Sequence, residues 1–423
     1  MDLQTQKLIF SCIAIFTITY IVDFNQIGAY WVSNERNNVH RKVLKNALVK
    51  FARLDGQESI ASENKYISPL SVEDEDDTLV TRSFKNSNST DSTEPYQDQP
   101  EFPHPHETEP IKFERDLLIM VLSKRDNFIT RQTIRETWAK NEKNIYFMVG
   151  KKYCPYPTDW LISSYGCTLM DYWSIKIEHK DLTKEEQLLL DYVSVKEDQI
   201  TARLENEENV VLLDIMDFYD GLTHKVKYSM KWAYEMINLN LVDQEEGETA
   251  KIPKWIMKID DDCILKATSY ESMLKTKYKN EKYLYFGRIQ FHGKPVLKKG
   301  KWADHKYPKK FYPWYADGNN GYVISLPILN YLMEEDTFQN LEEYQNEDAS
   351  LGIWLSQAPF QEEISYKTSK YYIKNLNPAL KLCVEGEREE SKLKYYRHIL
   401  VAGHKLNAKE IAYCWDKMFH YVH

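Results

Sequence analysis

The chain has 423 residues, which is enough for one large α/β domain, or two smaller ones, with additional segments. Its formal net charge of −9 provides no basic surface for a polyanion, so a nucleic-acid partner is not expected. Six cysteines in a chain of this length exclude a disulfide-built scaffold, and the sequence has no Cys-x-x-Cys pair that would indicate a zinc site.

The first predicted element is an apolar run at residues 8–22, between Lys7 and Asp23. It is short for a spanning helix and within the range of a signal-peptide core. Because no small-x-small cleavage site follows closely and residues 27–32 are apolar again, we predict an uncleaved signal anchor over residues 8–31. The flanking charges determine the topology poorly. A cytoplasmic tail of residues 1–7 and a single-pass type II orientation therefore depend on the segments that follow.

Residues 32–112 are predicted to be a largely disordered stem. They contain an acidic run, a run of Asn, Ser and Thr, and several prolines. A segment of this composition cannot bury enough apolar surface to fold. Asn88 begins an Asn-Ser-Thr sequon and is a candidate glycosylation site.

Residues 113–423 are predicted to fold as one domain of the α/β class. A strand at 116–122, a helix at 131–138 and a strand at 144–150 suggest a parallel βαβ unit. A charged helix is expected on the surface within 176–208. The further predicted elements are strands at 210–213, 283–287 and 322–325, a helix at 222–237, and helices that begin near Asn346 and Asn407.

The candidate chemistry lies at the end of a further strand, which begins at Trp255 and leads into Asp260, Asp261 and Asp262. Carboxylates at the carboxyl end of a buried strand lie at the edge where α/β sheets bind ligands. Asp260 and Asp262 offer oxygen ligands that suit Mg²⁺ or Mn²⁺. Asp-x-Asp spacing recurs in the acidic run of the stem, so the pattern alone leaves a plain acidic turn open.

The loops that follow this strand are rich in Tyr, Trp, Pro and Gly. At this density, such residues mark either loops that approach a ligand closely or irregular surface. The aromatic content of 13% suits stacking on sugar rings and equally suits an aromatic-rich core.

Six blocks, taken in order, resemble the β-1,3-galactosyltransferase and β-1,3-N-acetylglucosaminyltransferase family of Golgi enzymes. The resemblance extends from about Phe113 to the C-terminus. It implies a GT-A fold, which is a Rossmann-like mixed sheet with flanking helices, together with a UDP-sugar donor and Mn²⁺ or another divalent cation. The blocks are residues 127–138, 214–225, 258–262, 301–315, 347–352 and 403–405.

The resemblance also implies roles for individual residues. Without it, Arg131 and Arg135 would be expected on an exposed helix face, and His404 on the surface. Glu347 and Asp348 would simply complement a helix dipole. The implied roles are donor binding for Arg131, Arg135, Asp260, Asp261 and Glu347, metal binding for Asp260, Asp262 and His404, an acceptor-side loop containing Trp302, Tyr315, Gly318 and Gly321, and general base catalysis for Asp348.

The implied reaction inverts the anomeric carbon, because an α-linked UDP-sugar gives a β-linked product. This requires one general base at the acceptor hydroxyl and a Lewis acid at the departing UDP. The expected enzyme is a Golgi membrane hexosyltransferase that forms a β-1,3 linkage on a glycoprotein or glycolipid glycan. The transferred sugar is galactose or an N-acetylhexosamine, and galactose is favoured over N-acetylglucosamine.

Two other functions remain open at this stage: a catalytically silent relative that binds glycans or acts as a lumenal chaperone, and a soluble enzyme that is cytosolic or secreted. The chain departs from the family pattern at Gly221, Lys266 and Trp314 and in a Gly-rich loop one residue longer than usual, which leaves the sugar and the acceptor undetermined. Whether the chain forms a homodimer is also left open. In an oxidising lumen, Cys154 could pair with Cys167, and Cys383 with Cys414.

Overall fold

The computed structural model describes residues 111–155, 184–242, 251–299, 303–369, 372–375 and 398–419, all within one compact unit, Pro95–His423. The predicted anchor and Asn88 lie outside the described residues, as does the predicted stem apart from residues 111–112. None of the helices in the described part is long and apolar enough to cross a membrane. Cys154 and Cys414 are each disulfide-bonded. The two predicted pairings stay predictions, because Cys167 and Cys383 are not among the described residues.

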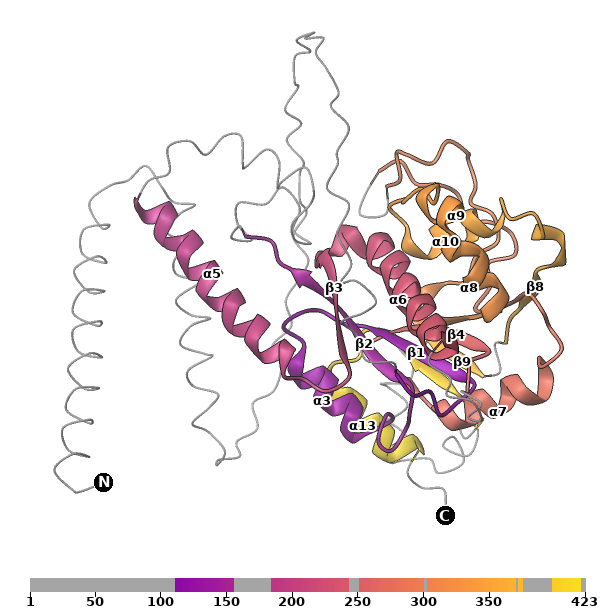
Figure 1. Ribbon diagram of the computed structural model, residues 1–423, viewed down its shortest axis with the longest axis horizontal. Coiled ribbons are helices and arrows are strands. Elements are labelled where there is room, and N and C mark those ends of the chain that lie inside the picture. The colour runs from indigo at the N-terminus through magenta and orange to yellow at the C-terminus, as the bar shows by residue number, and fades with distance from the viewer. Residues whose placement is uncertain are drawn as a thin grey trace, which may run out of the picture. The chain divides into compact units, whose positions relative to one another are not determined.

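The core of the unit is a seven-stranded mixed sheet (Figure 1), with the strand order β3-β2-β1-β4-β7-β6-β8. Strands β3, β2, β1 and β4 run parallel to one another, and β7 is antiparallel to both β4 and β6. The predicted parallel βαβ unit is confirmed, with α3 connecting β1 to β2. The bounds are β1 Leu117–Leu122, β2 Ile145–Lys152, β3 Val210–Met216, β4 Trp255–Asp260, β6 Leu284–Gly287, β7 Tyr322–Ser325 and β8 Ser365–Lys367.

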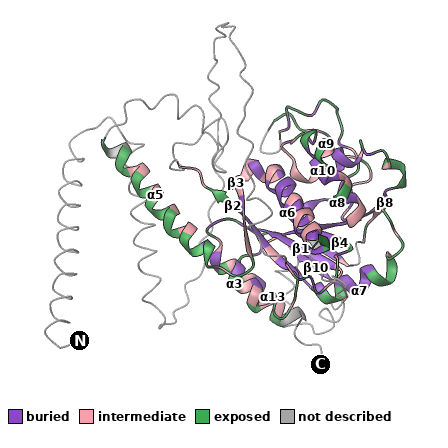
Figure 2. Ribbon diagram, in the orientation of Figure 1, coloured by how far each residue is buried: buried purple, intermediate pink, exposed green. Residues whose placement is uncertain are grey.

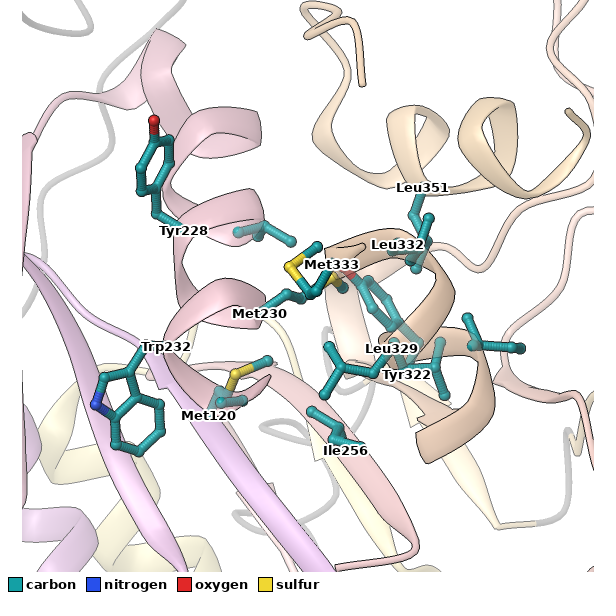
Figure 3. Packing of buried hydrophobic residues seen from close by; sticks show 14 of the residues in the cluster. Met120, Tyr228, Met230, Trp232, Ile256, Tyr322, Leu329, Leu332, Met333 and Leu351 are labelled. Carbon is teal, nitrogen blue, oxygen red and sulfur yellow. The ribbon is translucent and has the colours of Figure 1, made fainter. Parts of the chain in front are cut away.

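Helices cover both faces of this sheet, because its central strands are apolar on both sides. Alternate residues of β1 enter two different cores: Leu117 and Ile119 pack in one, Leu118 and Met120 in the other. The first core is closed by α3 Phe128–Glu136, α7 Ala267–Lys277 and α13 Ala408–Phe419. The second, shown in part in Figure 3, is closed by α6 Leu222–Val242, α8 Leu326–Met333, α9 Glu335–Gln339 and α10 Glu347–Leu355.

The predicted charged surface helix corresponds to α5 Lys184–Glu205. Figure 2 shows that it is exposed over much of its length. At its C-terminal end, Leu204 is buried against Phe128 and Val149, and this contact joins α5 to the start of α3 and to β2.

A second sheet has three short strands in the order β5-β10-β9, with bounds β5 Cys263–Leu265, β10 Val401–Gly403 and β9 Ile373–Asn375. Strand β5 begins directly after the acidic turn, and β10 pairs with it antiparallel, with Gly403 opposite Cys263. The sequence did not predict this sheet, nor α7, α8 and α9. Because β10 pairs with β5 in this sheet, the residue that follows β10, His404, lies beside the acidic turn.

Candidate active site

Strand β4 carries the acidic residues to the carboxyl edge of the main sheet, between β1 and β7. The strand ends at Asp260, and the chain turns at Asp261 and Asp262 before entering β5. One ligand atom from each of Asp260, Asp262 and His404 lies within 4.8 Å of the other two. The three residues that the resemblance implies as metal ligands are therefore brought together, although His404 is far from the others in the sequence.

His404 is held in place by close packing of β10 against β5. A Cβ atom at Gly403 would lie 2.7 Å from the Cα of Cys263, so a larger residue would separate the strands. The side chain of Asn320, from the short 3-10 helix Gly318–Asn320, donates a hydrogen bond of 2.9 Å to the carbonyl of Gly403. The Gly-rich loop and the second sheet thus jointly fix the position of His404.

The charged side chains of this group alter one another's pKa values. Burial raises the pKa of Asp260 to about 6, although Lys258 beside it opposes the shift. Burial also acts to raise the pKa of Asp262, but the adjacent imidazole of His404 and the hydrogen bond from the backbone N–H of Lys405 outweigh it, so this pKa is lowered. The Nδ1 atom of His404 lies 3.3 Å from Oδ2 of Asp262, and this close carboxylate raises the pKa of the imidazole. Two carboxylates and an imidazole form a donor set that fits Mn²⁺ and related divalent cations.

Asp261 is directed toward the loop after β1. Its Oδ2 atom accepts hydrogen bonds from Ser123 Oγ at 2.6 Å and from Asn127 Nδ2 at 2.9 Å. Burial raises its pKa despite these two bonds. The contacts anchor the acidic turn to the β1–α3 loop, and the implied donor-binding role of Asp261 stays a prediction.

Arg131 and Arg135 both pair with Glu207, which follows α5. Arg131 is fully buried and bonds Glu207 through Nη2 at 2.8 Å, so the alternative of an exposed helix face is wrong for this residue. Arg135 bonds the same carboxylate at 2.8 Å. Burial acts to raise the pKa of Glu207, but the hydrogen bonds from the two arginines lower it overall. Arg131 also donates to Ser123 Oγ at 3.0 Å and so supports the partner of Asp261. Contact of either arginine with a nucleotide remains a prediction.

Helix α10 begins beside the acidic strand. The side chain of Asn346 caps it by accepting the backbone N–H of Ala349, and Glu347 and Asp348 occupy the first turn. Glu347 faces the sheet. Its Oε2 lies 3.0 Å from the Nζ of Lys258, and its Oε1 accepts from the hydroxyl of Tyr322 at 3.1 Å. These contacts go beyond a simple dipole complement.

Asp348 lies against the Gly-rich loop. A Cβ atom at Gly318 would be 1.9 Å from the Oδ1 of Asp348, and the backbone N–H of Gly318 bonds this carboxylate. Burial, followed by repulsion from Glu347, holds the pKa of Asp348 well above its usual range. A partly buried carboxylate with raised basicity has the properties of a general base.

Two more of the predicted residues, Tyr315 and Gly321, lie among the described residues. Tyr315 is buried, and a Cβ at Gly352 of α10 would lie 2.6 Å from its Cβ, so the loop and the helix are in close contact. Gly321 has a φ of +71°, and a Cβ there would lie 2.4 Å from the carbonyl oxygen of Lys258. Trp302 lies outside the described residues.

Comparison with known proteins agrees with the resemblance. Residues 193–365 match the family described as Galactosyltransferase, a stretch that contains the acidic turn, Glu347 and Asp348. The similarity to this family covers less than half of the chain.

Two proteins illustrate the similarity. UDP-GalNAc:beta-1,3-N-acetylgalactosaminyltransferase 2 of Homo sapiens is 27% identical over 179 residues, which cover 42% of this chain and 32% of that protein. Hydroxyproline O-galactosyltransferase GALT6 of Arabidopsis thaliana is 31% identical over 172 residues, covering 38% and 24%. The match thus spans about a third or less of the length of these relatives.

Solved structures also align with the chain. A glycosyltransferase involved in the glycosylation of the major capsid of PBCV-1 aligns over 71% of this chain and 99% of its own, with 11% identity and a TM-score of 0.28. The galactosyltransferase LgtC aligns over 68% and 86%, with 11% identity and a TM-score of 0.26.

The sequence did not predict the residues that support the acidic side chains of this site. Lys258 and Tyr322 hold Glu347, and Ser123 and Asn127 hold Asp261. One signal was present for Lys258, because a lysine inside an apolar strand, two residues before Asp260, must share its face of the sheet. No local signal marks the other three, since their partners are distant in the sequence.

Proposed function

We propose that this chain is an inverting glycosyltransferase of the GT-A type, which transfers a hexose from a UDP-sugar to a glycan acceptor in β-1,3 linkage. One observation carries the proposal. In a chain with a galactosyltransferase-family region, Asp260, Asp262 and His404 converge at the carboxyl edge of the sheet, and Lys258 connects this group to the acids that open α10. The names of the two relatives support a UDP-sugar donor and a galactose-type sugar.

Asp260, Asp262 and His404 would hold the divalent cation, for which Mn²⁺ is the preferred choice given two carboxylates and an imidazole. When bound, the cation supplies positive charge that stabilises the departing diphosphate. Asp261, fixed by Ser123 and Asn127, would keep the acidic turn in register for the donor.

Asp348 would act as the base in a single displacement. Its carboxylate removes the proton from the acceptor hydroxyl while that oxygen forms a bond to the anomeric carbon and the bond to UDP breaks on the opposite face. The raised pKa makes the carboxylate a stronger base, since efficient proton transfer requires a pKa nearer the working pH. Glu347, fixed by Lys258 and Tyr322, would orient the donor sugar.

We also propose that the protein is a type II membrane protein of the Golgi, with its catalytic unit in the lumen. The apolar run at residues 8–22 supports the anchor. The disulfide-bonded state of Cys154 and Cys414 supports an oxidising compartment.

The test uses the full-length chain purified from a eukaryotic host in detergent. UDP release is measured with Mn²⁺ and UDP-Gal, UDP-GlcNAc, UDP-GalNAc or UDP-Glc, each with a panel of glycan acceptors, and Asp348→Asn is the control. Transfer from one donor that is abolished by EDTA and by the substitution would support the proposal and name the sugar. Folded protein that binds UDP-sugars without turnover would instead support the glycan-binding alternative.

A further inference from the structure

Lys258 is a buried lysine in the centre of the main sheet, with only 2% of its side chain exposed. Side chains alternate along β4, so Lys258 shares the face of Ile256, which belongs to the core closed by α6, α8 and α10. An ammonium group in such a place is costly unless charged partners compensate it. Its partners therefore indicate why the strand carries a lysine there.

Two carboxylates from different elements share this ammonium group. The Nζ atom lies 3.0 Å from Oδ1 of Asp260 at the end of β4, and 3.0 Å from Oε2 of Glu347 in the first turn of α10. Tyr322, which is opposite Lys258 in the β4–β7 register and is labelled in Figure 3, donates to the other oxygen of Glu347 at 3.1 Å. Both oxygens of Glu347 are thus bonded to side chains of the sheet.

Asp348 is held in the same arrangement. The point where a Gly318 Cβ would lie is 3.1 Å from Nζ of Lys258 and 1.9 Å from Oδ1 of Asp348, so both groups flank the glycine. The lysine charge opposes the increase in the pKa of Asp348 that burial and Glu347 produce. One positive charge accordingly faces three carboxylates, one of which belongs to the metal-binding group.

We propose that Lys258 is a positioning residue that ties the first turn of α10, with Asp348, to the metal-binding end of β4. Its catalytic consequence rests on the proposed function, whereas the tie itself does not. Without Lys258, Glu347 loses a charged partner and the first turn of α10 loses a direct bond to the strand that carries Asp260. Misplacement of a reacting group by about 1 Å costs roughly 100-fold in rate.

The test compares two variants, Lys258→Met and Arg115→Met. The second is the control, because it removes the positive partner of a different ion pair. Arg115 precedes β1, at the opposite edge of the sheet, and bonds the buried Glu271 at 2.6 Å. Three quantities are measured on the full-length protein: hydrogen exchange at the amides of Ala349 and Ser350, the affinity for Mn²⁺ in the presence of UDP, and kcat.

For Lys258→Met we expect exchange at these amides at least 10-fold faster than in Arg115→Met, and kcat lower by roughly 100-fold. The affinity for Mn²⁺ should not fall, because the substitution removes a positive charge next to a ligand of the cation. A role confined to general stability would instead weaken metal binding and turnover together, and would accelerate exchange equally in both variants.

Either of two results would overturn the proposal: exchange at Ala349 and Ser350 no faster in Lys258→Met than in Arg115→Met, or unchanged turnover in Lys258→Met alongside an active wild type. If the wild-type protein neither binds UDP with Mn²⁺ nor transfers sugar, the proposed function fails. The exchange measurement then decides by itself whether the lysine ties α10 to β4.

Discussion

Replacing Gly318 with alanine tests whether Asp348 is the base. The added methyl group would lie 1.9 Å from Oδ1 of Asp348, whereas Cβ contacts below 3.0 Å are essentially not seen, so the carboxylate must move by roughly 1 Å. The added methyl group would also lie 3.1 Å from Nζ of Lys258, which leaves little room on that side. Since such a displacement costs roughly 100-fold, we expect kcat to fall by about that factor.

Binding should respond differently from turnover. The three atoms nearest to the added methyl group belong to Asp348 and Lys258, and none belongs to Asp260, Asp262 or His404. The affinity for Mn²⁺ with UDP should therefore stay within about twofold of wild type. The matched control is Gly221→Ala, whose methyl group would meet the ring of Phe218 at 2.7 Å, and this aromatic side chain can turn away.

The assay measures kcat and KM for donor and acceptor, with thermal melting and circular dichroism to establish folding. If folded Gly318→Ala has the same kcat as Gly221→Ala, then either Asp348 is not the base or its carboxylate does not lie where the structure places it. If the affinity for Mn²⁺ fell by the same factor as kcat, the substitution would not act on Asp348 alone, and the reasoning would be refuted.

Three further outcomes are expected. His404→Ala should weaken Mn²⁺ binding at least 10-fold in a fluorescence titration with UDP present, whereas His224→Ala, at a histidine that pairs with a carboxylate elsewhere, should leave it unchanged. Glu207→Gln should lower the free energy of unfolding at pH 7 by about 3 kcal/mol, because it removes the charge that two arginines share. The folded-state pKa of Glu207 is depressed, so its stabilisation is complete above the unfolded pKa of about 4.3, and urea denaturation should show the variant's deficit shrinking as the pH falls through the lower, folded value. Gly321→Ala should destabilise the protein by about 2–5 kcal/mol, because its φ is +71° and its methyl group would overlap the carbonyl oxygen of Lys258; a deficit below 1 kcal/mol in urea would contradict this close approach.

Much of the fold could be predicted because its signals are local. The apolar runs that form β1, β2 and β4 carry their own evidence of burial, and the predicted parallel unit follows from their order with α3. The ends of the helices differ from those predicted. Helix α3 begins at Phe128 and not at residue 131, and α6 continues to Val242, beyond the predicted end at residue 237. The three-residue strands of the second sheet are too short to show any periodicity, and they were missed.

The sequence by itself determined the α/β class and the acidic turn at the end of β4, because a strand's pattern and the residues that follow it are adjacent in the chain. It also supplied the blocks that resemble the galactosyltransferase family. Tertiary structure alone brought His404 to Asp262, buried Arg131 against Glu207, and joined Lys258 to Glu347. Each of these pairs unites residues at least 76 positions apart. Their meeting depends on how strands pair and helices pack, and no local pattern of residues encodes that.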